Sequence, residues 1–513
     1  MEKSNKYIYA ALIIIVGIIA YFNIYNNQFL WDDEFFIQKN KFIRSFDYLP
    51  NIFTTSSGAG AGKLDDFYRP MQFVVYSVVY SISGLRTWPY HLLNVSLHLT
   101  NALLIFFIVK KLFVKEDIAF ITSVLWVAHP VQTEAITFIS GTADPLALLF
   151  MLSSFFCYIL FKSKTKLAYL LASVIFFTLA LLSKEIVIIF PLLLMLYEFL
   201  FSQEKNVARK YKWVVPFLIV ALIYFILRLS VLNFGGTLNL YKESNVYTQS
   251  LDYRIYTFLA ALLTYYSFLF APVSLHMERQ FPVHISILSP QVLISLFVLF
   301  GLSFILIKSI RKNRAVTFGI LWFFISFIPM SGVIPVNALI LEHWLYIPSI
   351  GFFLVVASAI SRLLKHQKYK SSGIAITVLL VITFIFISIN RNFDWKEPMI
   401  FYENILKYEE GTARIHNNLG MAYADVGKLK EAEKHYLKAI EISDTYAETH
   451  YNLANLYLKY DNVNNAILYL KRSIEINPNF FYSYELLGKI YEAKGQINVA
   501  EEYYRKARNT KYY

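Results

Sequence analysis

A cluster of acidic residues follows the first apolar stretch of the chain. Asp32, Asp33 and Glu34 stand together directly after Trp31. Adjacent carboxylates can supply one base and one group that orients an acceptor, because burial and mutual repulsion raise the pKa of one of them. Acidic residues are also common where a helix leaves a membrane, without any catalytic role. The pattern therefore makes Asp32 and Asp33 candidate catalytic residues and leaves this non-catalytic alternative open.

Charged and polar side chains recur along the chain within stretches that are otherwise apolar. Polar groups at membrane depth are costly, so they usually face a protein interior or a wet cavity. Hydrogen bonding between helices explains the uncharged ones equally well. The charged ones favour a site more strongly, because several charges must be kept from lipid together. The candidates of this kind are His91, His129, Glu134, Asp144, Lys184 and Glu185.

The elements that carry these residues are apolar runs of membrane-spanning length. The chain is 57% hydrophobic and only 16% charged, whereas a soluble chain carries about 25% charged residues. A spanning helix needs ~20 apolar residues, and eleven runs approach that length. Segments 71–85 and 257–273 are ambiguous, so we expect about 11–13 spans. The eleven runs are 7–22, 91–109, 118–139, 144–161, 167–183, 186–201, 213–233, 290–307, 315–335, 345–363 and 372–390.

Basic residues between the runs set the predicted orientation. Lysine and arginine cluster in alternate connections, such as 110–115 and 308–314, on the side of the N-terminus. The positive-inside rule makes that side cytoplasmic, and an odd number of spans puts the C-terminus outside. The same clustering explains the net charge of +13, so no nucleic-acid partner is expected. The composition favours an integral protein of a bacterial plasma membrane.

One polar triplet divides a long apolar stretch. Residues 167–200 have one central polar interruption, Ser183-Lys184-Glu185. A single helix of that length would be about 50 Å long, whereas the hydrocarbon core is about 30 Å thick. The stretch is therefore predicted to be two helices with the triplet at their external tip. Lys184 then lies on the side where positive charge is disfavoured.

A second part of the chain begins near residue 391, where the composition becomes charged. Leu419, Leu453 and Leu487 are spaced by 34 residues, and small residues recur beside them. A 34-residue period is the signature of tetratricopeptide helix pairs. The predicted organisation is a membrane domain at 1–390, a linker and leading helix at 391–412, and three repeats at 413–513.

Taken in order, the polar motifs resemble those of the transmembrane and tetratricopeptide-repeat O-mannosyltransferase family, part of the GT-C glycosyltransferase superfamily. The resemblance includes the domain order, and it departs at Thr142-Ala143-Asp144 and at His343, where the family usually has arginine. It implies an all-α fold, with a polytopic transmembrane helical bundle of GT-C type followed by a tetratricopeptide repeat α-solenoid. The motifs are Trp31-Asp32-Asp33, Tyr68-Arg69-Pro70, His91-Leu92-Leu93-Asn94, His129-Pro130-Val131-Gln132-Thr133-Glu134, Ser183-Lys184-Glu185 and Glu342-His343-Trp344.

The resemblance also implies an inverting enzyme that moves mannose or another hexose from a polyprenyl-phosphate donor to a hydroxyl of a protein or envelope glycan. Either Asp32 or Asp33 would be the base, with Asp32 preferred, and the other carboxylate would orient the acceptor. The donor phosphate would be bound by Arg69, Lys184 and His343. No metal or cofactor is expected, because the lipid-linked sugar is a substrate. The acceptor and sugar site would contain Glu34, His91, His129, Glu134, Asp144, Glu185 and Glu342.

Two other classes of function remain open at this point. A transporter or flippase would also use buried charges and broken helices, although no inverted repeat is visible in the span pattern. A membrane-anchored scaffold would use the repeats to bind a protein partner, but a single span would be enough to anchor it. The polar clusters in the remaining spans favour an enzyme whose repeats bind the acceptor or another protein.

Overall fold

The structure is a computed structural model of the chain, and it describes residues 5–63, 65, 67–229, 246–333 and 338–510. The regular elements in these ranges are all helices. The chain divides into two compact units, Met1–Lys396 and Glu397–Tyr513. The predicted all-α class, with membrane helices followed by tetratricopeptide helix pairs, is confirmed.

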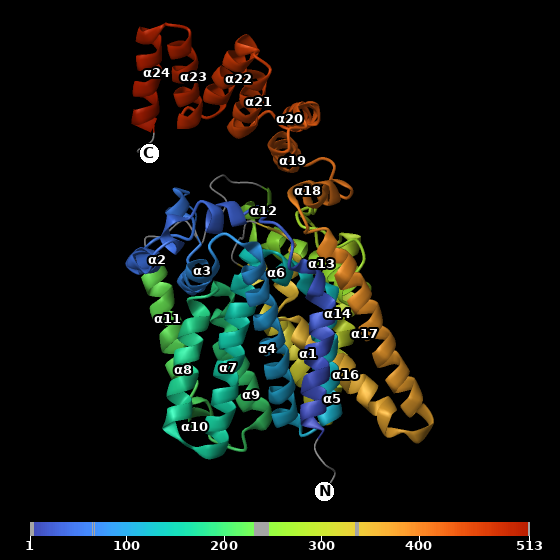
Figure 1. The fold of residues 1–513 in the computed structure, drawn as a ribbon. Helices are drawn as coiled ribbons and strands as arrows, with labels where there is room; N and C mark the ends of the chain where they lie inside the picture. Colours follow the sequence, from blue (N-terminus) through green and yellow to red (C-terminus); the bar gives the residue numbers. More distant parts are fainter. Residues whose placement is uncertain (1–4, 64, 66, 230–245, 334–337, 511–513) are drawn as a thin grey trace. The chain divides into compact units, whose positions relative to one another are not determined.

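The first unit is a bundle of apolar helices, in which each of the eleven predicted runs overlaps a helix (Figure 1). Its helices are α1 (Lys6–Tyr21), α2 (Leu49–Thr54), α3 (Pro70–Ser83), α4 (Thr87–Phe113), α5 (Glu116–Ala128), α6 (Thr133–Thr137), α7 (Ala143–Lys164), α8 (Leu167–Leu181), α9 (Phe190–Phe201), α10 (Val207–Tyr211), α11 (Val215–Leu229), α12 (Val246–Gln249), α13 (Leu251–Phe270), α14 (Pro290–Ser309), α15 (Arg314–Phe327), α16 (Ser349–Lys365) and α17 (Lys370–Phe393).

Within the part of the chain that the structure describes, five helical stretches are long and apolar enough to cross a membrane by themselves, among them Thr87–Phe113 and Gln367–Phe393. The most apolar windows of Pro290–Ser309 and Gln367–Phe393 are only 17% buried within the protein. Such apolar surfaces require lipid around them. The chain is therefore an integral membrane protein, and the count of 11–13 spans stays a prediction. The ambiguous segments 71–85 and 257–273 are helical as α3 and α13.

The predicted run at 118–139 is not one continuous helix. Helix α5 ends at Ala128, because Pro130 has no N–H to continue it. The 13 residues of α5 span about 20 Å, which is shorter than a bilayer core. The chain then turns through a short 3-10 segment and the five-residue α6. This break brings the polar residues of 129–144 to one end of the bundle.

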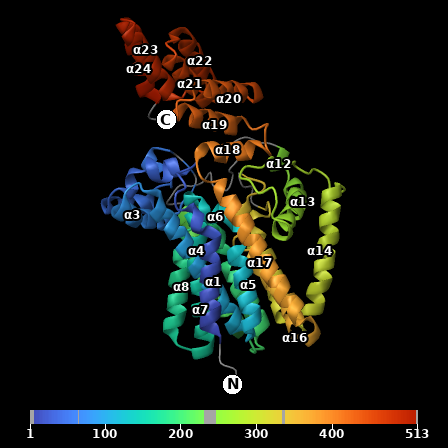
Figure 2. The ribbon, with the colours of Figure 1, turned by 45° about the vertical axis from the view of Figure 1, so that its right-hand side comes forward.

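The centre of the bundle is held by close helix packing and by polar contacts between helices. Helices α15 and α16 cross where Gly319 meets Gly351, and a Cβ on Gly351 would lie 2.3 Å from the Gly319 carbonyl oxygen. Only glycine permits this approach. Ser388 of α17 donates to the Ala128 carbonyl at 2.9 Å, and Figure 2 shows α17 beside α1, α5 and α16.

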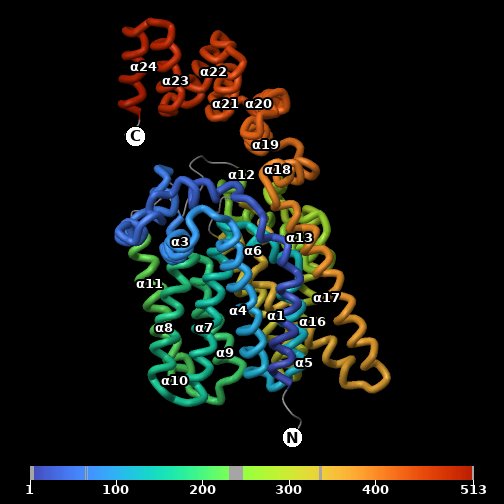
Figure 3. Tube along the Cα trace, in the orientation of Figure 1, coloured from blue at the N-terminus to red at the C-terminus, as the bar shows by residue number. Residues whose placement is uncertain are grey.

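The predicted division of residues 167–200 into two helices at Ser183-Lys184-Glu185 is confirmed, whereas the external position of this triplet stays a prediction. Helix α8 ends at Leu181, a short 3-10 segment covers Glu185–Ile189, and α9 begins at Phe190. Figure 3 follows this path in the Cα trace. The triplet thus lies at a helix junction, where its side chains can meet other elements.

The second unit is a row of antiparallel helix pairs preceded by one short helix. Small residues recur because the two helices of a pair approach closely: a Cβ on Gly420 would lie 2.7 Å from the Tyr436 ring. The helices are α18 (Pro398–Leu406), α19 (Ala413–Asp425), α20 (Leu429–Ile442), α21 (Ala447–Lys459), α22 (Val463–Ile476), α23 (Phe481–Ala493) and α24 (Ile497–Thr510).

Candidate active site

The two carboxylates of the acid pair have different surroundings. Asp33 is 1% exposed, and its Oδ1 accepts hydrogen bonds from the backbone N–H of Ser140, at 2.8 Å, and from the Ser140 hydroxyl. Its Oδ2 accepts from the Leu30 N–H at 2.9 Å. The Asp32 side chain is 34% exposed, with an oxygen 3.9 Å from Lys63 Nζ. Asp33 is thus an anchor, whereas Asp32 can be reached by a substrate.

Burial raises the pKa of Asp33 to about 7, against the lowering effect of its three hydrogen bonds. The backbone around the pair is unusual as well. Trp31 has a φ of 51°, which is uncommon for a bulky residue, and Glu34–Gln38 form a rare π-helical turn. Glu34 itself pairs with Lys39. Anchored strain of this kind is frequent where a side chain must be held in place.

Asp33→Asn is expected to destabilise the folded protein, whereas Asp32→Asn is not. The amide that replaces one Asp33 oxygen would face either the Leu30 N–H or the Ser140 donors, leaving a buried donor without an acceptor. Such a loss costs about 1–3 kcal/mol. Thermal unfolding of the detergent-solubilised chain measures it. Equal unfolding temperatures for the unaltered chain and Asp33→Asn would contradict the anchoring role.

Four predicted site residues, together with Arg228, form a basic centre at the α8–α9 junction. Lys184 Nζ lies 2.7 Å from both carboxylate oxygens of Asp144, and both side chains are almost fully buried. Arg69 Nη2 lies 3.0 Å from Glu185 Oε1, and Arg228 Nη1 lies 3.9 Å from Glu185 Oε2. Among the described residues, three cations lie beside two carboxylates, and this excess of positive charge can attract an anion.

Two backbone connections bring the acid pair and the basic centre to the same region. The Met71 N–H donates to the Leu182 carbonyl at 3.1 Å, which attaches the segment of Arg69 to the end of α8. Ser140, which holds Asp33, precedes Asp144 by four residues at the start of α7. Carboxylates and cations from four parts of the sequence therefore converge on residues 139–144.

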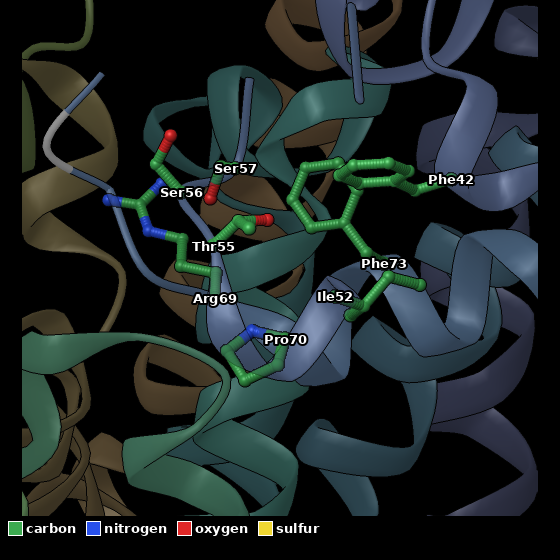
Figure 4. Close-up of a pocket in the computed structure, with 8 residues that line it drawn as sticks. All are labelled: Phe42, Ile52, Thr55, Ser56, Ser57, Arg69, Pro70 and Phe73. Atoms are coloured by element: carbon green, nitrogen blue, oxygen red, sulfur yellow. The ribbon is translucent and has the colours of Figure 1, made fainter. Parts of the chain in front are cut away.

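A small cavity lies beside Arg69. Figure 4 shows Arg69 and the hydroxyl residues at 55–57 on one side and the rings of Phe42 and Phe73 on the other. Its volume is about 10 Å³, roughly the space that one water molecule requires. This cavity is too small for a sugar, so a substrate would have to approach the basic centre from outside it.

A second charged cluster contains Glu134, Glu342 and His343, which were also predicted to belong to the site. Glu134 accepts from the His343 backbone N–H at 3.1 Å and lies 2.7 Å from its Nδ1. Glu342 lies 3.2 Å from Arg279 Nη2 and 3.5 Å from Arg391 Nη2. The structure thus pairs Glu134 with His343 and places two arginines on Glu342.

The two predicted site histidines contact the backbone. His91 Nε2 lies 3.1 Å from the Asn27 carbonyl oxygen, and His129 Nδ1 accepts from the Val131 N–H at 3.2 Å while its Nε2 lies 3.3 Å from the Leu269 carbonyl. These bonds give both rings a structural role. Their part in a sugar site stays a prediction. Within the described ranges, no group of three or more His, Cys, Asp and Glu side chains could hold a metal ion, and the expected absence of a metal or cofactor also stays a prediction.

Sequence reasoning missed four residues of these clusters. Arg228 lies near the outer end of the run 213–233, and Arg391 directly follows the run 372–390. Both are on the side where positive charge is disfavoured, and this was a usable signal. Arg279 lies in a polar connection after α13, where an arginine is unremarkable. Ser140 gave no signal at all, because a lone serine in a helix junction has no distinctive pattern.

The chain is similar to known proteins in both of its parts. Residues 69–231 match the dolichyl-phosphate-mannose-protein mannosyltransferase family, and residues 411–479 and 481–507 match tetratricopeptide repeats. A protein O-mannosyl-transferase of Caenorhabditis elegans is 29% identical, over 85% of this chain and 63% of its own length. The protein O-mannosyl-transferase TMTC3 of Homo sapiens is 25% identical, over 84% of this chain and 51% of its own.

The chain therefore spans about half to two thirds of the length of these curated relatives. Among solved structures, ArnT from Cupriavidus metallidurans, bound to undecaprenyl phosphate, matches with a TM-score of 0.43 and 14% identity, covering 93% of this chain and 80% of that one. The resemblance indicated by the motifs, to the transmembrane and tetratricopeptide-repeat O-mannosyltransferases, is confirmed by the relatives and the family models.

Proposed function

We propose that this chain, which resembles the transmembrane and tetratricopeptide-repeat O-mannosyltransferases, is a membrane glycosyltransferase. It moves a hexose, for which mannose is the first candidate, from a polyprenyl-phosphate donor to a hydroxyl of a protein or envelope glycan. The observation that carries this proposal is the meeting of an anchored acid pair and a net-positive centre at residues 139–144. An acceptor base and a phosphate-binding centre are the two parts that such a reaction needs.

In the proposed reaction, Asp32 takes the proton of the acceptor hydroxyl while the oxygen of that hydroxyl attacks the anomeric carbon of the sugar. The bond between that carbon and the phosphate oxygen breaks, and its electron pair leaves with the lipid phosphate. Attack opposite the leaving group inverts the anomeric centre. Asp33 and Ser140 hold the segment that carries Asp32, so that its carboxylate meets the acceptor in a fixed geometry.

The departing lipid phosphate is negatively charged, so its stabilisation requires fixed positive charge nearby. Lys184, Arg69 and Arg228 supply that charge, while Asp144 and Glu185 hold these cations in place before the phosphate arrives. We assign the cluster of Glu134 and Glu342 to the sugar and acceptor. His343, which is held by Glu134 and stands where the family usually has arginine, is assigned to the donor phosphate.

We further propose that the N-terminus is cytoplasmic and that the reaction and the repeats are on the opposite side, in a bacterial plasma membrane. The distribution of basic residues supports this orientation. The lipid donor would enter from the bilayer, which explains why the catalytic unit is embedded in it.

Mass spectrometry of envelope glycoproteins and glycans, from cells with and without this chain, tests the proposed function. The expected result is the loss of a single hexose mass from serine or threonine residues, or of one hexose from an envelope glycan. An unchanged set of glycans in cells that demonstrably lack the chain would contradict the proposal.

Removal of the repeats is expected to impair transfer to a large acceptor more than hydrolysis of the donor, because stacked helix pairs bind partners without a buried reactive centre. The cut must follow Lys396, which closes the first unit. Asn392 has to stay, since its amide holds the Ala20 and Asn23 oxygens and accepts from Thr137. Equal loss of both activities in a truncated chain with normal unfolding would argue against this division of labour.

A further inference from the structure

The first helix pair of the repeat unit has an open groove. It lies among α18, α19 and α20 and has a volume of about 680 Å³, within the range of about 300–1,000 Å³ that is usual for ligand sites. Leu406, Leu419 and Leu437 supply its apolar surface. Two histidines and Tyr423 also line it, and its charged residues are Glu403, Lys407, Glu410, Lys434, Lys438 and Glu441.

The second repeat shows what fills the equivalent position 34 residues later. There Arg472 Nη2 lies 2.6 Å and its Nε 3.2 Å from Asp444 Oδ2, while its Nη1 lies 3.1 Å from Glu475. Asp444 also contacts His450 Nε2 at 2.5 Å. A guanidinium therefore bridges two carboxylates beside a histidine ring.

The first repeat has a carboxylate at each of the two equivalent positions, but it has a lysine where the second repeat has its arginine. A shift of 34 residues converts Asp444 and Glu475 to Glu410 and Glu441, and Arg472 to Lys438. Lys438 Nζ contacts Glu441 on its own helix, at 3.0 Å. Among the described side chains no ion pair is formed by the Glu410 carboxylate. The first groove thus keeps two carboxylates that hold an arginine in the next repeat.

Two histidines add an acceptor to this groove. His416 Nε2 lies 3.1 Å from the Glu410 carbonyl oxygen, so this nitrogen carries the hydrogen. His416 Nδ1 then accepts from His435 Nδ1 at 2.9 Å, which leaves His435 Nε2 without a hydrogen. Burial lowers the pKa of both histidines, so this arrangement of neutral rings holds at pH 7. A donor such as a guanidinium can hydrogen-bond to His435 Nε2.

We propose that this groove binds an arginine side chain of a partner polypeptide, with the guanidinium on Glu410 and Glu441 as Arg472 is placed in the second repeat. Lys407 and Lys434, which also line the groove and are exposed, take a carboxylate next to that arginine. The partner is therefore a protein segment in which arginine stands beside aspartate or glutamate. The proposal deepens the partner role given to the repeats under the proposed function, and binding alone can test it.

The test uses the full detergent-solubilised chain and a fluorescent peptide that contains one arginine between two glutamates in a glycine-serine background. The control peptide carries citrulline, the neutral analogue of arginine. We expect the arginine peptide to bind at least about tenfold more tightly, as hydrogen bonds to charged groups allow. Anisotropy titrations measure both affinities. Equal affinities, or no binding of either peptide, would overturn the proposal whether or not the chain transfers sugar.

Two variants show whether the binding is in this groove. Glu410→Gln changes an exposed side chain, so it should fold normally, and it should bring the two peptide affinities within about twofold of each other. Lys438→Arg places a guanidinium where the second repeat has one, so it should fill the groove and weaken peptide binding. Retention of the full arginine preference by both folded variants would place the binding elsewhere and contradict the proposal.

Discussion

Asp32→Asn is expected to transfer sugar at least about a hundredfold more slowly than the unaltered chain, because loss of a general base costs about 10²–10⁴ in rate. The change is nearly isosteric, and the Asp32 side chain is 34% exposed. Folding and donor binding should therefore stay normal. Single-turnover transfer at saturating donor separates the chemical step from binding.

A matched control is available in the same segment. Asp47 is an exposed carboxylate whose Oδ2 accepts from the Ser45 hydroxyl at 2.8 Å, and Asp47→Asn should change the transfer rate by less than a few-fold. Near-native rates for both Asp32→Asn and Asp47→Asn would mean that the acid pair has no catalytic role. The proposed mechanism would then lose its base.

Lys184→Met is expected to lower the stability of the membrane unit by about 3–5 kcal/mol, the usual cost of leaving one member of a buried ion pair alone. Lys184 and Asp144 are each 4% exposed, and their atoms lie 2.7 Å apart. The double variant Lys184→Met, Asp144→Leu removes both charges and should recover most of this loss. The unfolding temperatures of the two single variants and the double variant measure the coupling.

The double variant also separates a structural role from donor binding. If Lys184 binds the phosphate, the double variant should unfold near the normal temperature yet bind the polyprenyl-phosphate donor at least about tenfold more weakly, as expected for a lost charged hydrogen bond. Arg69→Gln, which leaves the Lys184 pair intact, should weaken donor binding without the same loss of stability. Unchanged donor affinity in the double variant would make Lys184 a purely structural residue.

Those parts of the fold that depend on local pattern could be predicted from the sequence. A long apolar run predicts a membrane helix without any knowledge of what that helix packs against, and each of the eleven runs overlaps a helix. The triplet at Lys184 had to be a junction because a continuous helix would exceed the bilayer. The 34-residue interval of Leu419, Leu453 and Leu487 predicted the three helix pairs. The break after Ala128 was not predicted, because the run 118–139 has the length of a spanning helix and Pro130 was given less weight than that length.

The contacts within the candidate site could not be predicted, because they join residues that are far apart in the chain. Asp33 and Ser140 are separated by 107 positions, and Lys184 and Asp144 by 40. A single sequence shows which charges are hard to place in lipid, but it does not show which of them pair. It therefore could not reveal that Asp33 is an anchor or that Arg228 shares Glu185 with Arg69.

The most direct test of the central claim is the transfer of a labelled sugar from polyprenyl-phosphate mannose by the purified full chain in detergent. We expect lipid phosphate to be released. With an acceptor peptide rich in serine and threonine present, an equal amount of mannose should be transferred with inverted configuration. Asp32→Asn, measured in parallel, should lose this activity. If the purified, folded chain neither transfers mannose nor hydrolyses the donor, and Asp32→Asn behaves identically, the proposed glycosyltransferase is contradicted.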